Sequence, residues 1–255
     1  MSHLSILPGS NGLRFIQGTS ELPARLDFLA DTDYSNTLRL NDFEISTVEH
    51  LLAAFYLCGI TDADIEIKGS EVPILDGSAR PYVELLKEAG RSPLEKHALC
   101  LRIMRSVTAR RGDSFARLEP SLDFELEVSI DYDHPKIGRQ SFSARVGEEC
   151  RNEDFVSART FGFLEDEHKL HSLGLALGTS AENTLLFSDA KSPAPEMRYV
   201  DEPVRHKALD ALGDLSLLGF RIAGRYVAHK AGHGLNALLL RKLIRERENY
   251  QIEYL

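Results

Sequence analysis

The chain has 255 residues, a formal net charge of −9, 43% hydrophobic residues and 27% charged residues. These proportions are ordinary for a globular protein, and the length suffices for one large domain or two small ones. The acidic balance excludes the basic field that nucleic-acid binding requires, so we expect no nucleic-acid partner.

The first part of the chain alternates short apolar segments with turn residues, which is the spacing of strands. Between Ser46 and Cys58 the apolar period becomes helical. Ser46 or Thr47 is placed to cap the first turn of this helix, and Gly59 is placed to end it. Residues 91–97 are the predicted domain boundary. The predicted elements are strands at 4–7, 12–16, 36–40 and 63–67, helices at 46–58 and 79–90, and a turn-rich loop at 71–78.

The second part of the chain repeats this order of strands followed by helices. In both parts a helix that opens with a histidine, His50 or His206, is followed by a glycine and a strand. This repeated order of elements predicts an α+β fold of two similar domains, 1–92 and 93–255. Each domain is a sheet packed against helices, with the active site in the cleft between them. The predicted elements are strands at 98–107, 114–118, 123–131, 140–145, 160–163, 185–187 and 222–229, helices at 165–172, 203–218 and 234–245, and a helix or loop at 150–157.

A histidine and an aspartate lie at helical spacing in the long helix of the second part. His206 and Asp210 are four residues apart, so both side chains point to one helix face, about one turn apart. With His50 they would supply the three protein ligands of a catalytic zinc site, which keeps its fourth position open. The same ligand types also suit iron(II). The alternative is that each histidine only forms hydrogen bonds near a helix start, which is the commoner role of a single histidine.

Metal-assisted hydrolysis also needs a base and an acid. Glu49 adjoins a predicted ligand and is placed to take a proton from water. His233, on a glycine-flanked turn, is placed to donate one if Asp214 keeps it protonated. Thr160 could donate a hydrogen bond to an oxyanion, and Lys207 could contact an anionic group of the substrate. The structural alternatives are a solvent-exposed carboxylate or lysine and a threonine that serves only its strand.

Cysteine usage and hydropathy bear on the compartment. Cys58, Cys100 and Cys150 lie far apart without paired spacing, which fits a reducing environment better than a disulfide framework. No apolar run reaches the ~18 residues of a membrane span, and no export signal opens the sequence. We therefore predict a cytoplasmic protein without a membrane span.

Several segments, in one order over nearly the whole chain, resemble the zinc-dependent UDP-3-O-acyl-N-acetylglucosamine deacetylases of lipid A biosynthesis. One such segment would be weak evidence, whereas the ordered set is specific. The segments are 46–52 (STVEHLL), 71–79 (EVPILDGSA), 131–140 (DYDHPKIGRQ), 158–163 (ARTFGF), 174–176 (GLA), 182–183 (EN), 205–207 (RHK), 213–215 (GDL) and 230–233 (KAGH).

The resemblance implies a zinc amidohydrolase that removes the N-acetyl group from UDP-3-O-(3-hydroxyacyl)-N-acetylglucosamine and releases acetate. Its small-molecule partner would be this UDP-sugar with a fatty acyl chain, and residues near 163–187 would build a hydrophobic passage for that chain. The implied roles are zinc ligands for His50, His206 and Asp210, general base for Glu49, general acid for His233 with Asp214 as its orienting partner, oxyanion stabilisation for Thr160, and substrate contacts for Phe161 and Lys207.

The start of the sequence departs from the family pattern. Family members usually carry an additional strand pair before the region in which Met1 lies, so we expect the first sheet to lack part of its strands. The catalytic residues are all retained, which favours retained chemistry. Two other hypotheses stay open: a paralogue that uses this chemistry on another N-acetylated sugar, and a shortened zinc-binding protein without catalysis.

Overall fold

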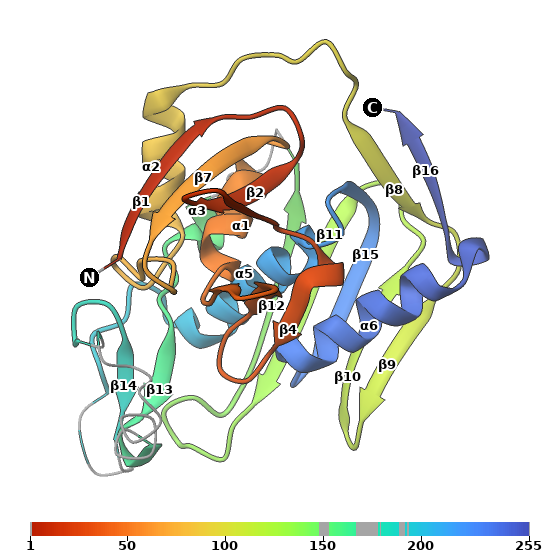
Figure 1. The fold of residues 1–255 in the computed structure, drawn as a ribbon. Coiled ribbons are helices and arrows are strands. Elements are labelled where there is room, and N and C mark those ends of the chain that lie inside the picture. The colour runs from red at the N-terminus through yellow and green to blue at the C-terminus, as the bar shows by residue number, and fades with distance from the viewer. Residues whose placement is uncertain are drawn as a thin grey trace.

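The computed structural model describes residues 2–147, 153–166, 178, 180–188, 192 and 194–254. Two sheets lie on opposite sides of a layer of helices, with α1 (Glu49–Leu57) and α5 (Glu202–Ser216) near the centre (Figure 1). The chain therefore has the mixed α+β fold that the sequence predicts. The contact between α1 and α5 joins elements from the two parts of the chain.

The first sheet is built from N-terminal strands in the order β1-β7-β2-β3. Its strands pair antiparallel, except that β2 runs parallel to β7. Phe15, Leu22 and Ile65 are fully buried, because alternate residues of these strands point to the side covered by helices. The bounds are β1 (His3–Pro8), β2 (Leu13–Gln17), β3 (Ser20–Pro23) and β7 (Ala63–Lys68), and a separate three-stranded sheet holds β4 (Leu29–Asp31), β5 (Thr37–Leu40) and β6 (Phe43–Ile45).

The large sheet belongs to the second part of the chain. Its order is β12-β11-β15-β10-β9, with β8 paired to β15 and β16 paired to β8. The central strand β15 runs parallel to both β11 and β8. The bounds are β8 (Leu99–Ile103), β9 (Val107–Arg111), β10 (Ser114–Glu119), β11 (Phe124–Asp131), β12 (Arg139–Val146), β15 (Arg221–His229) and β16 (Tyr250–Tyr254), and a short parallel pair is formed by β13 (Phe161–Phe163) and β14 (Leu185–Phe187).

The helices cover the sheets and meet each other. Helix α2 (Arg80–Ala89) packs on α1, α5 covers β11 and β12, and α6 (His233–Arg245) covers β9 and β10. Gly59 follows α1 and Gly219 follows α5, both with positive φ, and a strand follows each glycine as predicted. The prediction that the second helix opens with His206 was wrong, because α5 begins at Glu202. Shorter helical segments are α3 (Glu153–Val156), η1 (Leu26–Phe28), η2 (Leu164–Asp166) and η3 (Arg247–Asn249). Among the described residues, no helix has the length and apolar character needed to cross a bilayer.

One predicted strand is divided in the structure. The expected strand at 98–107 is two strands, β8 and β9. The backbone N–H groups of Met104 and Arg105 both donate to the Asn249 carbonyl, at 2.8 and 3.3 Å. The chain therefore turns towards η3 between the two strands, a long-range contact that leaves no mark on local hydropathy. Strands β3, β4, β6 and β16 were also not predicted.

The predicted cap of the first long helix was wrong. The Ser46 hydroxyl donates to the Ser70 carbonyl and the Thr47 hydroxyl donates to the Glu71 carboxylate. Thr47 also has a φ of 60°, a left-handed conformation that is costly for a β-branched residue. Both hydroxyls therefore hold the loop after β7 against the start of α1. The expected helix at 165–172 lies mostly outside the described residues, and 164–166 form η2.

The domain division at 92/93 stays a prediction. The strands of the first sheet all precede it, and the strands of the large sheet all follow it. Contacts also cross it, since the Leu26 N–H donates to the Leu217 carbonyl at 2.9 Å and the Arg241 guanidinium donates to the Leu29 carbonyl at 3.1 Å. The segment around η1 therefore rests on helices of the second part.

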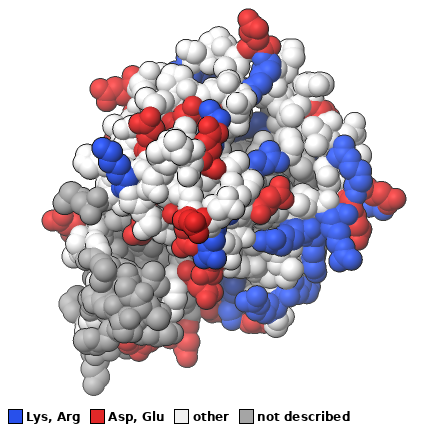
Figure 2. Space-filling view, viewed as in Figure 1, with Lys and Arg blue, Asp and Glu red and all other residues white. Residues whose placement is uncertain are grey.

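Basic side chains gather over α6 and β9 on the face shown in Figure 2. The sequence holds two basic clusters, 105–111 and 241–247, and the fold brings them together. The Lys242 ammonium donates to the Thr108 carbonyl at 3.2 Å, and Arg105 forms an ion pair with Glu248. The patch is a local feature of an acidic protein, and acidic side chains are interspersed in it.

Candidate metal centre and active site

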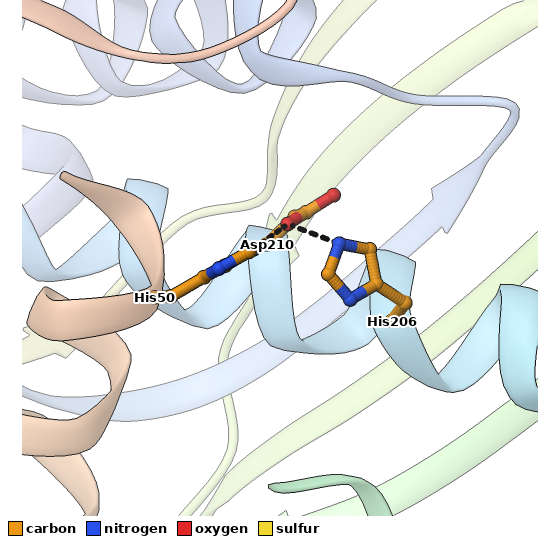
Figure 3. Close-up of side chains that lie close together, drawn as sticks. All are labelled: His50, His206 and Asp210. Atoms are coloured by element: carbon orange, nitrogen blue, oxygen red, sulfur yellow. Dashed lines mark ion pairs between the residues drawn. The ribbon is translucent and has the colours of Figure 1, made fainter. Parts of the chain in front are cut away.

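His50, His206 and Asp210 meet between α1 and α5 (Figure 3). The Nε2 atoms of His50 and His206 lie 3.5 and 3.2 Å from Asp210 Oδ1. One ligand atom of each residue lies within 4.8 Å of the others, and all three side chains are buried. The three predicted ligands are thus close enough to bind one metal ion.

The close approach of the two helices depends on a glycine. A Cβ added to Gly213 of α5 would lie 2.2 Å from the backbone oxygen of Glu49 in α1. Because packed atoms cannot approach so closely, any larger side chain at this position would displace one helix. Gly213 therefore sets the distance at which His50 faces His206 and Asp210.

We expect Gly213→Ala to move α1 away from α5. Overpacking of this kind costs about 1–3 kcal/mol, so the free energy of unfolding should fall by that amount in urea titrations, and metal affinity should fall with it. A matched control is Gly147→Ala, because a Cβ at Gly147 would meet no atom of the described residues within 4 Å. Wild-type metal affinity in Gly213→Ala would show that the glycine does not set the ligand spacing.

The ionisation of the ligand side chains suits a metal ion. His206 Nδ1 lies 2.9 Å from the Ala158 carbonyl oxygen. A carbonyl only accepts hydrogen bonds, so Nδ1 carries the proton and Nε2 presents its lone pair to the centre. Burial lowers the pKa of His206 and so favours the neutral form. Burial would raise the pKa of Asp210, but His206 and Lys207 lower it well below its usual range. Two imidazoles and a carboxylate fit zinc, and they also fit iron(II).

Glu49 opens α1 directly before His50, and its side chain is buried. Its Oε2 accepts a hydrogen bond of 3.0 Å from the backbone N–H of Asn36. Burial raises the pKa of Glu49, and the charges of His233 and His50 oppose this effect. A carboxylate with a raised pKa beside a candidate metal centre has the properties of a general base.

His233 and Asp214 form a buried pair, with 2.8 Å between His233 Nδ1 and Asp214 Oδ1. Asp214 also accepts hydrogen bonds from the side-chain amides of Asn36 and Asn236, at 2.5 and 2.6 Å. Burial lowers the pKa of His233, but Asp214 and Glu49 outweigh it and raise the pKa to about 10. His233 is therefore protonated at neutral pH, which is the form that a general acid requires.

Of the remaining predicted residues, Phe161 and Lys207 contact the predicted ligands. Thr160 is placed only through its position in the chain, two residues after Ala158, whose carbonyl faces His206. The Phe161 ring is 6.5 Å from the His206 ring and 5.5 Å from the Lys207 ammonium. Lys207 also forms an ion pair of 2.8 Å with Asp210, a contact that was not predicted.

Several residues of this region were not predicted to belong to a site. Asn36 and Asn236 reach Asp214 from a loop and from α6. Glu202 is fully buried, and its Oε1 accepts hydrogen bonds from the backbone and the guanidinium of Arg159, at 2.9 and 3.1 Å. This holds the segment that contains the Ala158 carbonyl. The sequence shows an acidic residue before a proline at the start of this helix, but it does not show that the residue is buried.

Part of the predicted acyl-chain passage, near 163–187, lies outside the described residues, as does the segment 174–176. The described part contains β13 and β14. The rings of Phe161 and Phe163 lie 6.3 and 6.5 Å from the Phe187 ring. Whether these aromatic residues contact an acyl chain stays a prediction.

Comparison with known proteins gives consistent matches. A family model described as UDP-3-O-acyl N-acetylglycosamine deacetylase matches residues 2–245. A relative from Syntrophus aciditrophicus is 41% identical over 226 residues, which cover 88% of this chain and 72% of the relative. A relative from Psychrobacter arcticus is 41% identical over 240 residues, covering 93% and 75%. One from Anaeromyxobacter dehalogenans is 38% identical over 252 residues, covering 98% and 82%. All three are named UDP-3-O-acyl-N-acetylglucosamine deacetylase.

Proposed function

The chain belongs to the UDP-3-O-acyl N-acetylglycosamine deacetylase family, and from this premise we infer that it is a metal-dependent hydrolase that releases acetate from UDP-3-O-(3-hydroxyacyl)-N-acetylglucosamine. The observation that supports this most is the meeting of His50, His206 and Asp210 beside a buried carboxylate and a buried imidazolium. The substrate is a UDP-sugar with a fatty acyl chain, and its deacetylation serves lipid A biosynthesis. We propose zinc as the metal, with iron(II) as the alternative.

The base of this reaction is Glu49. A metal held by the three ligands would polarise the acetamide carbonyl and acidify the attacking water. The Glu49 carboxylate takes a proton from that water as the water oxygen adds to the carbonyl carbon. The backbone N–H of Asn36 binds Glu49 Oε2 and so orients the carboxylate before the substrate arrives.

The acid is His233. Because Asp214 holds its Nδ1, the proton for the leaving amine comes from Nε2. The hydroxyl of Thr160 donates a hydrogen bond to the tetrahedral oxyanion, and Phe161 and Lys207 contact the substrate. When the C–N bond breaks, the protonated amine and acetate leave.

The raised pKa of His233 predicts the pH dependence. The imidazolium is lost as pH rises through about 10, so activity should fall there. Asp214→Asn removes the charge that raises this pKa and leaves burial, which lowers it. The alkaline limb of kcat/KM should therefore move to lower pH, as measured by acetate release. Asp113→Asn is a matched control, since Asp113 is exposed and pairs with Lys230. An alkaline limb that is the same in Asp214→Asn and wild type would exclude His233 as the acid.

A direct assay tests the function. The purified protein, freed of metal and reloaded with zinc or with iron(II), should release acetate from the acylated UDP-sugar and much more slowly from UDP-N-acetylglucosamine. Faster release from another N-acetylated sugar would favour the paralogue. Full metal loading without acetate release would favour the non-catalytic protein. The cytoplasmic location inferred from cysteine usage stays a prediction.

A further inference from the structure

Asn36 lies in the loop between β4 and β5, and it contacts both residues that control proton transfer. It is 1% exposed. Its backbone N–H donates to Glu49 Oε2 at 3.0 Å, and its side-chain Nδ2 donates to Asp214 Oδ1 at 2.5 Å. Because Glu49 belongs to α1 and Asp214 to α5, one loop residue bridges the two helices at the site.

The Asp214 oxygen that Asn36 contacts is shared with the acid. Oδ1 accepts from both the Asn36 amide and His233 Nδ1, the latter at 2.8 Å. Two donors divide the charge of one oxygen, so the amide moderates the bond between Asp214 and His233. The other oxygen, Oδ2, accepts from Asn236, whose Oδ1 accepts in turn from the Tyr226 hydroxyl at 2.5 Å. All side-chain groups of this network are buried.

We propose that Asn36 is a positioning residue that fixes the Glu49 carboxylate relative to the Asp214–His233 pair. The proposal rests on the proposed function, in which these groups act as base and acid. The side-chain bond to Asp214 anchors the loop, and the anchored loop presents its backbone N–H to Glu49. The essential property of the side chain is then its hydrogen-bond donor and not its volume.

Two substitutions separate the donor from the volume. Asn36→Ala removes both, and kcat should fall about 10- to 100-fold, as for other partners of catalytic groups, with little change in KM. Asn36→Asp keeps the volume but places a second carboxylate against Asp214. We expect a larger loss of kcat for Asn36→Asp than for Asn36→Ala at neutral pH, because like charges at this distance repel.

The Asn36→Asp variant should regain activity as pH is lowered. One proton shared by the two carboxylates restores a donor to Asp214. The charged and titratable groups around Asp214 are Lys207 on α5, Tyr226 on β15 and His233 on α6. Glu49 on α1 and Asp210 on α5 act in turn on His233. These groups are present in both the wild type and Asn36→Asp. The ratio of the variant kcat to the wild-type kcat at each pH therefore reports the effect of the new carboxylate.

The matched control for the Asn36 variants lies in the same loop. Asp33→Asn makes an amide–carboxylate exchange at an exposed position of the same loop and should leave kcat unchanged. Wild-type kcat in Asn36→Asp combined with a loss in Asn36→Ala would mean that Asn36 only fills space. A ratio of variant to wild-type kcat that does not rise at low pH would also overturn the proposal.

A measurement without substrate keeps the two proposals separable. In the metal-free protein the Nδ1 proton of His233 should give a proton NMR signal that moves downfield in Asn36→Ala, because Asp214 Oδ1 loses a competing donor. A signal at the same chemical shift in Asn36→Ala and wild type would overturn the proposed role of Asn36. This test does not depend on whether Asn36→Asp folds. If the wild-type protein releases no acetate, the proposed function is refuted. The NMR result would then still test the role of Asn36.

Discussion

Replacing Glu49 with glutamine is expected to lower kcat for acetate release by about 10²- to 10⁴-fold, the usual range for a general base. Glutamine has the same shape, and its side-chain oxygen still accepts the hydrogen bond that the Asn36 N–H gives to Oε2. It cannot take a proton from water. The loss should therefore appear in kcat, while zinc content, measured by atomic absorption, stays at the wild-type level.

Stability separates this effect from damage to the fold. Burial raises the pKa of Glu49, which means that the site disfavours the ionised carboxylate. A neutral amide avoids that cost, so the melting temperature of Glu49→Gln should be no lower than that of the wild type. Glu44→Gln serves as a control, because Glu44 is exposed and its carboxylate pairs with Arg39. Near-normal turnover in Glu49→Gln would require a different base.

The second large effect concerns the metal. His206→Ala removes one of the three proposed ligands. Zinc affinity should fall by more than about 100-fold, which is the largest usual effect of losing a residue that only orients a ligand. The Ala158 carbonyl also loses its donor. Zinc affinity is measured by competition with a chelator, and acetate release should be lost in parallel at limiting zinc.

A histidine away from the centre provides the comparison. His229 on β15 contacts Ser129, with 2.9 Å between Nδ1 and Oγ, and His229→Ala should keep wild-type zinc affinity. A full complement of tightly bound zinc in His206→Ala would remove His206 from the ligand set.

Part of the site follows from local rules. His206 and Asp210 lie on one helix face because their spacing is one helical turn, and the structure places the nearest atoms of their side chains 3.2 Å apart. Asp214 lies one turn further on, and its pairing with His233 was predicted. The placement of His206, Asp210 and Asp214 on one face needed only the existence of one long helix, which a regular apolar period over fifteen residues marks clearly. The pairing with His233 also needed α6 to pack against α5.

Other features could not be inferred locally. Asn36 and Asn236 make hydrogen bonds across 178 and 22 positions of sequence, and no periodic pattern encodes partners so far apart. The caps expected at Ser46 and Thr47 failed for the same reason, since their hydroxyls bond 24 positions away. A nearby cap and a distant partner require different orientations of the same hydroxyl, and only the assembled fold shows which contact forms.

The amino-acid sequence by itself determined the helices and most strands, the ligand pair on α5 and the residue types of the site, because propensity and periodicity act within a few residues. Only the tertiary structure decided that His50 reaches that pair. His50 lies on α1, which packs on α5 at a distance that Gly213 permits. Close contact between segments that are far apart in sequence depends on the shapes of both surfaces. The hydrogen bonds of Asn36 to Glu49 and Asp214 were decided at the same level.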